Sequence, residues 1–538
     1  MKYLLTGVAA IAMLTACGQK DKPGESEAPS GIIFSEEGVP EYKVQNGDAE
    51  TAPAALAAMS LETSGAGPTS WLGKDMKGDQ AVFTDVVVKS IGDADDADMS
   101  DTDLKIAKLE FDGLAMKDGQ PSFSRLRMSD MTLVPTDPDE AAEGSGTIGS
   151  VELVNPSPET AAWFATLFTD GDTPDLPEGA ALAFDHFEMD DVDFRIDEEE
   201  GDQGRFKVGT IEVTGMKDQK AALMKLDGMA FDMTDAAEGT NMKVNLAKVE
   251  MRGADLKLLS GATEDVTDPE DVSEMMNLAS QDPANPGYDS LTIDAFDMDL
   301  AGVKIDLPKL VSAVGRDKKS DLVAVKTEPF KVSLSTGEGK FGEELGAQLA
   351  MLGYETMELT GSGYQTYDPG SDLTTYVKGQ NFWELKDGFR IDFAMKYAGA
   401  KEMAAAEQAQ AAYASPGDVL DETLQKMVLH NIELTIDDDG FLDRAFNAYA
   451  AQSGQDPQEL RNQVTGLLAM APMMAAGSGI DAQLITEAST ALSSFVSDPK
   501  TLTLKMAPAE PLALSTLAEM EDPSLITKES LGFEASNE

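Results

Sequence analysis

The chain has 538 residues, a length that fits two to four domains and can bury a sizeable core. It carries 97 Asp and Glu against 41 Lys and Arg, and the resulting formal net charge of −56 repels phosphate backbones and anionic lipid headgroups. A nucleic-acid partner and a polybasic membrane patch are therefore excluded. A hydrophobic content of 42% is too high for a disordered chain. One cysteine and two histidines leave no disulfide framework and no thiolate zinc site.

The N-terminus is typical of an export signal, which we assign to residues 1–16. Lys2 precedes an apolar run that is too short to span a bilayer. The run ends in Leu14-Thr15-Ala16-Cys17, which resembles the lipobox of bacterial lipoproteins. The resemblance implies that a lipid is attached to Cys17 and that the signal is removed just before it. Gly18 follows the cysteine instead of Asp, which implies sorting to the outer membrane of a Gram-negative bacterium.

Three regions are expected after the signal. Residues 17–70, the lipidated Cys17 and a stretch rich in Gly, Ser, Pro and charged residues, are predicted to form a flexible tether with one small helix at 53–61. Residues 71–400 alternate apolar and polar side chains in short runs, which is typical of half-buried strands. The clearest runs are 82–88, 330–334 and 389–393.

A pattern of apolar, any, apolar, any, any, apolar, acidic, apolar residues recurs in this region. Side chains in a strand alternate between the two faces of the sheet, so the first apolar pair and the last apolar pair of this pattern would lie on opposite faces. The backbone must depart from a regular strand at the two central positions to bring both pairs to one face. We expect a β-bulge there, with Glu110, Glu212 and Glu250 exposed and their apolar neighbours buried. The seven copies are 104–111, 182–189, 206–213, 244–251, 291–298, 352–359 and 427–434.

Helical spacing is found at 157–168 and, more briefly, at 307–314. Residues 401–538 are predicted to be mainly helical. Asp456-Pro457 provides an N-cap and a first-turn proline for one helix, and another apolar stripe follows at 484–496. Residues 501–506 are expected to form a closing strand before a loose tail. The predicted fold class is α+β, dominated by long bulged antiparallel sheets.

The alternating strands, the glycine-ended copies of the pattern and the helix expected at 307–314 resemble the AsmA-like repetitive β proteins of the Gram-negative envelope. The resemblance implies a curved sheet with an apolar lining and a role in moving lipids.

Candidate chemistry is sparse. Gly337-Glu338-Gly339-Lys340-Phe341-Gly342 matches the dinucleotide fingerprint, but the preceding run alternates and the acidic residues would repel a pyrophosphate, so we reject it. His186 and His430 lack a second ligand or nucleophile nearby and are interpreted as solvent-facing or edge-strand histidines. The acidic clusters 93–98 and 437–440 do not fit an EF-hand and are interpreted as solvated loops.

The sequence thus predicts no catalytic residue, no cofactor and no metal site, and Cys17 as the one site residue. The favoured function is that of a membrane-anchored, non-catalytic scaffold or carrier whose apolar sheet face shields acyl chains. The 28 methionines support an adaptable apolar surface. The alternative is an acidic, surface-exposed interaction protein that binds calcium or a basic partner.

Overall fold

A computed structural model describes residues 31–34, 38–89, 102–135, 144–169, 177, 181–197, 203–235, 240–259, 282–410, 425–476, 479–518 and 526–538. The chain divides into two compact units. Unit 1 comprises residues 1–35, 258–289 and 302–538, and unit 2 comprises residues 36–257 and 290–301.

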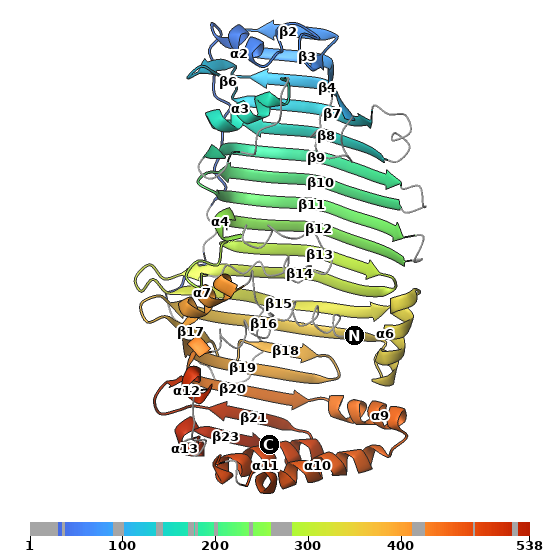
Figure 1. The fold of residues 1–538 in the computed structure, drawn as a ribbon, viewed down its shortest axis with the longest axis vertical. Helices are drawn as coiled ribbons and strands as arrows, with labels where there is room; N and C mark the ends of the chain where they lie inside the picture. Colours follow the sequence, from blue (N-terminus) through green and yellow to red (C-terminus); the bar gives the residue numbers. More distant parts are fainter. Residues whose placement is uncertain are drawn as a thin grey trace. The chain divides into compact units, whose positions relative to one another are not determined.

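Unit 2 is an antiparallel meander in which each long strand pairs with the next along the chain (Figure 1). A hairpin, β5 (Ala115–Lys117) and β6 (Gln120–Ser122), and helices α2 (Ala52–Ala58), α3 (Pro158–Thr166) and α4 (Leu256–Leu259) accompany it. The sheet strands are β1 (Thr69–Ser70), β2 (Gly73–Lys77), β3 (Gln80–Val88), β4 (Thr102–Asp112), β7 (Arg125–Pro135), β8 (Gly144–Val154), β9 (Phe184–Asp197), β10 (Gln203–Met216), β11 (Lys220–Asp235), β12 (Thr240–Asp255) and β13 (Ser290–Leu300).

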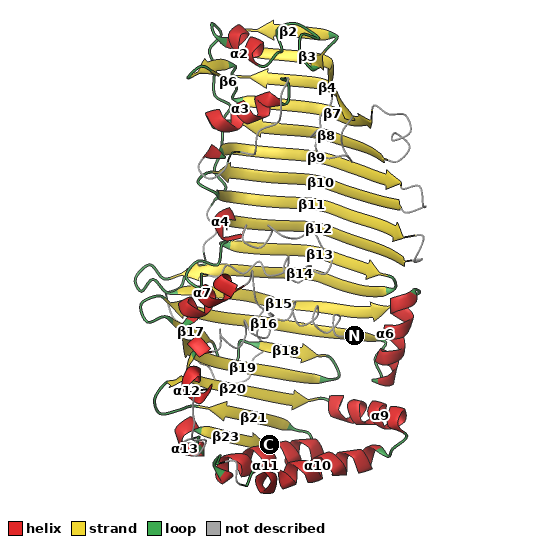
Figure 2. Cartoon of the chain, viewed as in Figure 1, coloured by secondary structure: helices red, strands yellow, loops and turns green. Residues whose placement is uncertain are grey.

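Unit 1 combines antiparallel strands with most of the helices, which Figure 2 shows in red. Its strands are β14 (Val303–Arg316), β15 (Val323–Thr336), β16 (Thr356–Asp368), β17 (Leu373–Tyr376), β18 (Phe382–Leu385), β19 (Phe389–Ala398), β20 (Val428–Asp438), β21 (Thr501–Met506), β22 (Leu512–Ala513) and β23 (Phe533–Asn537). Its helices are α6 (Lys340–Met351), α7 (Ala400–Gln410), α9 (Phe441–Ser453), α10 (Pro457–Met474), α11 (Ala482–Ser497), α12 (Leu514–Ala518) and α13 (Lys528–Leu531).

The predicted fold class is confirmed, because antiparallel strands dominate both units and the helices are short. The N-caps of two helices also agree with the sequence. The Ser157 side chain accepts a hydrogen bond from the Thr160 N–H at the start of α3. Asp456 accepts from the Gln458 and Glu459 N–H groups at the start of α10. Both helices therefore begin where their capping residues predict.

In each long strand of unit 2 from β3 to β13, the alternation of side chains between the two faces of the sheet shifts by one residue at one position. We call this shift a phase change, and the positions form a line across the sheet. In β4, Ile106 and Leu109 are both buried while Ala107 and Lys108 between them are exposed, so the two apolar pairs lie on one face as predicted. Equivalent positions lie opposite one another on adjacent strands. They are Asp85, Ala107, Asp130, Gly149, Asp191, Gly209, Gly228, Ala247 and Ala295.

The backbone feature that causes the phase change is not the expected β-bulge. No residue is inserted, because the register is the same on both sides of the line. Instead, alternate strands carry one residue with positive φ, such as Asp191 at 52° and Ala295 at 50°. A Cβ on the facing Gly149 would lie 2.8 Å from the Asp191 Cβ, so the close approach requires glycine there. The one-residue bulge prediction is therefore wrong for these strands, because all of them change phase together and no strand needs an extra residue.

An ordinary register shift does occur in β20, within the copy at 427–434. Lys396 pairs with Asn431 and Tyr397 pairs with Leu429, which leaves His430 as the extra residue. The copy at 352–359 is not a strand throughout, because Leu352 is the C-cap of α6.

The acidic positions of the pattern are less exposed than predicted. The side chains of Glu110, Glu212 and Glu250 are 24%, 22% and 18% exposed, because lysines and arginines pair with them. Among their apolar neighbours, Leu109, Phe111 and Met251 are buried as expected. Ile211, Val213 and Val249 are only half-buried.

Two further expectations are wrong. Residues 307–314 lie inside β14 and not in a helix, because strand pairing with β15 outweighs a short helical pattern. The tail is not loose, since β23 pairs with β21. In the region after residue 400 the described residues are mainly helical, as expected, and they also form β20 to β23.

Much of the predicted tether that the structure describes is folded. Leu56 and Met59 are 1% and 0% exposed and belong to the core of unit 2, so residues 52–61 are a packed part of that unit. Earlier still, Ile33 forms a β-bridge with Arg316, and Ile32 packs against Ala324, Tyr364 and Val377 of unit 1. The prediction of a flexible tether is therefore wrong for residues 31–34 and 52–61, and its first part, residues 17–30, lies outside the described residues.

Candidate functional site

Two apolar rows run straight across the unit 2 sheet, one side chain from each strand. We name them row A and row B. Row A consists of Phe83, Leu109, Met128, Val151, Met189, Ile211, Leu226, Val249 and Ile293. Row B consists of Ala81, Phe111, Leu126, Leu153, Phe187, Val213, Met224, Met251 and Leu291.

The rows are covered at one end. Over β3 to β8 they form a core with Leu56 of α2, Ala161 and Ala165 of α3, and Phe168. Phe83, Leu109 and Leu126 are there fully buried at 0% exposed. Over β9 to β13 the same rows are mostly half-buried, as at Ile211, Leu226 and Val249. Both apolar rows thus continue past α2 and α3. Figure 1 shows these two helices beside the part of the sheet that runs from β3 to β8.

A charged row lies on the opposite face. Glu152, Glu188 and Glu212 are directly opposite one another on β8, β9 and β10, with Arg127 3.6 Å from Glu152 and Lys225 4.0 Å from Glu212 at the two ends of this run. Burial, and then the nearby Asp190 carboxylate, raise the pKa of Glu188 above its usual value. Like charges in direct cross-strand pairs destabilise a sheet. The full row is Glu110, Arg127, Glu152, Glu188, Glu212, Lys225 and Glu250.

His186 lies beside this charged row and is buried at 6% exposed. Its Nδ1 is 3.0 Å from the Thr214 hydroxyl and its ring stacks on Tyr42 with 4.7 Å between centroids. The Asn155 amide binds the same N-terminal segment, donating to the Lys43 carbonyl and accepting from the Gln45 N–H. Burial lowers the pKa of His186. These contacts hold the segment against the sheet. The prediction of a solvent-facing or edge-strand histidine is therefore wrong for His186, because β9 pairs with strands on both sides and Tyr42 covers the ring.

The other sequence candidates also have structural roles. His430 is the extra residue of the β20 bulge, and burial together with Lys396 lowers its pKa. The glycine fingerprint follows β15, which is antiparallel to both neighbours, whereas a dinucleotide site needs a parallel sheet. A Cβ at Gly342 would lie 2.4 Å from the Gly337 carbonyl oxygen, so that glycine is needed for close packing.

The acidic cluster at 437–440 is used for hydrogen bonds within the chain. Asp438 accepts from the Gly440 and Leu442 N–H groups, and Asp437 accepts from the Thr501 hydroxyl. Among the described residues, no group of three or more His, Cys, Asp or Glu side chains is placed to hold a metal ion. Cys17 and the cluster at 93–98 lie outside the described residues.

Sequence reasoning missed an exposed apolar surface on α10. Residues 462–480 are 19 consecutive residues without a charge in a chain of net charge −56. Leu467, Met470, Met473 and Met474 are 62%, 47%, 70% and 73% exposed, and we call these four residues the Met surface. The sequence signal is the uncharged run itself.

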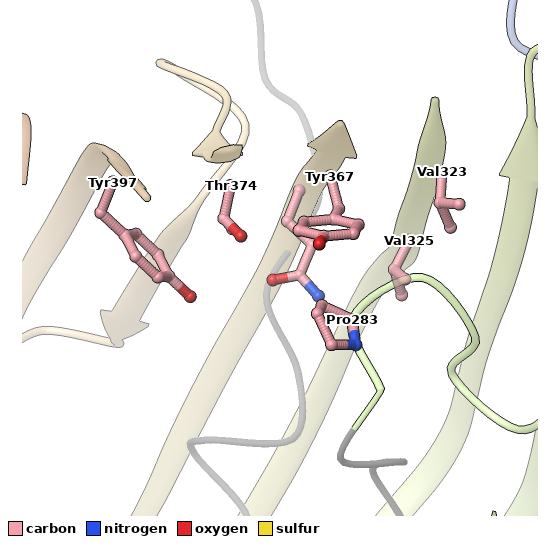
Figure 3. Close-up of a pocket in the computed structure, with 7 residues that line it drawn as sticks. Pro283, Val323, Val325, Tyr367, Thr374 and Tyr397 are labelled. Atoms are coloured by element: carbon pink, nitrogen blue, oxygen red, sulfur yellow. The ribbon is translucent and has the colours of Figure 1, made fainter. Parts of the chain in front are cut away.

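A cavity in unit 1 is too small for a substrate or an acyl chain. Its volume is about 60 Å³, enough for about two water molecules. Figure 3 shows Tyr367, Thr374 and Tyr397 around it, with Pro283 at its side. Burial and the Asp372 carboxylate, which accepts a hydrogen bond from the Tyr367 hydroxyl at 2.8 Å, raise the pKa of Tyr367. We find no catalytic arrangement in its lining.

A family model described only as "Uncharacterized protein" matches residues 382–538, from β18 to β23, and thus includes α10. No curated protein matches the chain. Within the described ranges, no helix combines the length and apolar character that a bilayer crossing requires.

Proposed function

We propose that this protein is a lipid-anchored, non-catalytic carrier of the Gram-negative envelope, which shields acyl chains along rows A and B over β9 to β13. In this proposal Cys17 bears the lipid and holds the protein at the outer membrane. The observation that carries the proposal is the continuation of both rows past α2 and α3 as half-buried side chains.

Physical chemistry supports an apolar ligand at this strip. Each buried methylene contributes about 0.8 kcal/mol, so an acyl chain along several half-buried residues gains several kcal/mol. Met189 and Met224 are unbranched and polarisable, and such side chains adapt to chains of different length. The curved, apolar-lined sheets implied by the AsmA-like resemblance agree with this role.

The test is the lipid content of purified protein. The chain with Cys17→Ser is isolated without detergent and its organic extract is examined by mass spectrometry. We expect phospholipid close to one molecule per chain. Leu226→Gln and Val249→Gln should lower the retained lipid, because each places an amide in the strip. Thr292→Gln, next to the charged row on β13, is the matched control. Folded protein without lipid would refute the carrier function.

A second candidate function, the binding of a basic partner, is favoured by the row Glu152, Glu188 and Glu212, in which like charges face one another although Arg127 and Lys225 approach the outer two. Cationic side chains of a partner would relieve the repulsion among the three carboxylates. For the calcium alternative, the described residues contain no group of three acidic side chains placed to hold the ion. If a basic partner binds at this row, oligolysine should raise the melting temperature of the protein. Glu188→Gln should reduce this rise, whereas lipid retention should not change.

A further inference from the structure

The Met surface has no described partner in a protein whose remaining surface is strongly acidic. It lies on the C-terminal half of α10. Near the N-terminal end of this helix, by contrast, Leu460 is buried at 8% exposed. The opposite side of α10 packs on α11, where the Ser493 hydroxyl donates to the Thr465 carbonyl. An exposed apolar helix face of this kind marks an interaction site.

The attachment of the chain to unit 1 limits how far this unit can lie from the proposed anchor. From Cys17 to Gly31 the chain advances 31 − 17 = 14 residues. Fully extended, 14 residues reach at most about 50 Å. Because Gly31 to Phe34 lie against β14 and β16, unit 1 must remain within that distance of the lipid attached to Cys17.

The attachment point and the end of α10 lie at the same end of the unit 1 sheet. Arg316, which bridges Ile33, ends β14, and the strand ladder leads from it to Val428 at the start of β20. The turn after α10 is held at this end as well: the Lys528 N–H of α13 donates to Asp481, and Ala507 donates to Leu531. Figure 1 shows α12 and α13 at this end.

The distance along that end is compatible with the tether. From β14 to β23 the ladder has seven steps, through β15, β16, β17, β19, β20 and β21. At about 4.8 Å per step this is roughly 34 Å, less than the reach of the tether. One membrane surface can therefore accommodate both the anchor and the end of α10.

The absence of charged residues around the Met surface indicates which kind of partner it can bind. With a net charge of −56, most of the protein surface is repelled by an anionic membrane, but residues 462–480 carry no charge. The run also lacks the lysines and arginines with which amphipathic helices bind anionic lipid. It therefore fits a lipid surface of low charge, whose apolar interior receives flexible methionine side chains.

We propose that the Met surface of α10 inserts into the bilayer that holds the lipid anchor, so that unit 1 contacts the membrane at two points. This inference rests on the anchoring part of the proposed function, but it does not depend on acyl-chain binding in unit 2.

The experiment is flotation of the chain from residue 17, with Cys17→Ser, on phosphatidylcholine vesicles. We expect the protein to float, and flotation to fall as phosphatidylglycerol replaces phosphatidylcholine, because the protein is anionic. The double variant Met473→Asp, Met474→Asp should lower vesicle partitioning on the order of tenfold or more. Met351→Asp is the matched control, since Met351 is an exposed methionine of α6 in the same unit at 50% exposed.

An unchanged melting temperature for all variants shows that folding is not the cause. Absence of flotation, equal flotation of the double variant, or stronger binding to anionic vesicles would overturn the inference. If lipid remains bound in unit 2 while flotation is absent, the carrier function stands and only membrane contact by α10 fails. Loss of bound lipid with normal flotation gives the opposite result.

Discussion

Rows A and B have the same residue types along their length but different burial. Over β3 to β8, Phe83, Leu109 and Phe111 are buried beneath α2 and α3. Over β9 to β13, Ile211 and Val249 occupy equivalent positions and are only half-buried. An identical strand pattern therefore forms a core in one region and an available apolar strip in the other, and the helices above the sheet make the difference.

The largest expected effect contrasts these two regions directly. Phe111→Ala should lower the free energy of unfolding by about 3–5 kcal/mol, because it leaves a cavity in a fully covered core. Val249→Ala in row A should cost only about 1 kcal/mol, because its side chain is half-buried. Urea denaturation measures both values. Equal costs would contradict the difference in coverage.

Removal of the cover is the next test. Leu56→Ala in α2 should cost about 2–4 kcal/mol, since Leu56 is 1% exposed against the sheet. A flexible tether at this position would predict no change in the denaturation midpoint. Ala54→Ser, at an exposed position of the same helix, is the control and should change stability by less than about 0.5 kcal/mol.

The line of phase changes crosses both regions and predicts smaller effects of opposite sign. Ala295→Gly should stabilise the protein by about 1 kcal/mol, because φ is 50° and alanine is strained there. Ala247→Gly, on the facing strand, should destabilise by about 0.5–1 kcal/mol, because there glycine only adds freedom to the unfolded chain. Thermal unfolding of the two variants distinguishes the positions. A gain in both would contradict the assigned backbone geometry.

The smallest effect is the pH dependence of stability that arises from His186 and Glu188 of β9. Burial lowers the pKa of His186, so below its unfolded pKa near 6.5 the unfolded chain binds more protons and stability falls. The raised pKa of Glu188 acts in the opposite sense, because the folded chain then binds more protons above about pH 4.5 and acidification stabilises it.

The two contributions are separated by variants. His186→Asn should remove the loss of stability on acidification below pH 6.5, and Glu188→Gln should raise the melting temperature at pH 7 by removing like-charge repulsion. Denaturation midpoints measured from pH 5 to pH 8 test both expectations. A His186→Asn profile parallel to that of the wild type would contradict the assigned burial.

Local patterns were sufficient for several elements. Alternation identified β3, β15 and β19, and the capping residues Ser157 and Asp456 located α3 and α10. These signals depend on residues near one another in the chain, so they are readable without the fold. The opposite parity of the two apolar pairs also required a phase correction, which the structure contains at residues 104–111.

Contacts between distant residues decided the rest. Residues 307–314 have a short helical pattern, but pairing with β15 places them in a strand. Leu56 and Ile33 lie in a stretch of tether-like composition, yet each finds apolar partners far along the chain. The uncharged run 462–480 is apparent in the sequence, but only the packing of α10 on α11 determines which of its side chains remain exposed. Sequence thus determined which residues seek apolar surroundings, while the tertiary structure decided which of them are covered, because burial depends on neighbours that local periodicity does not identify.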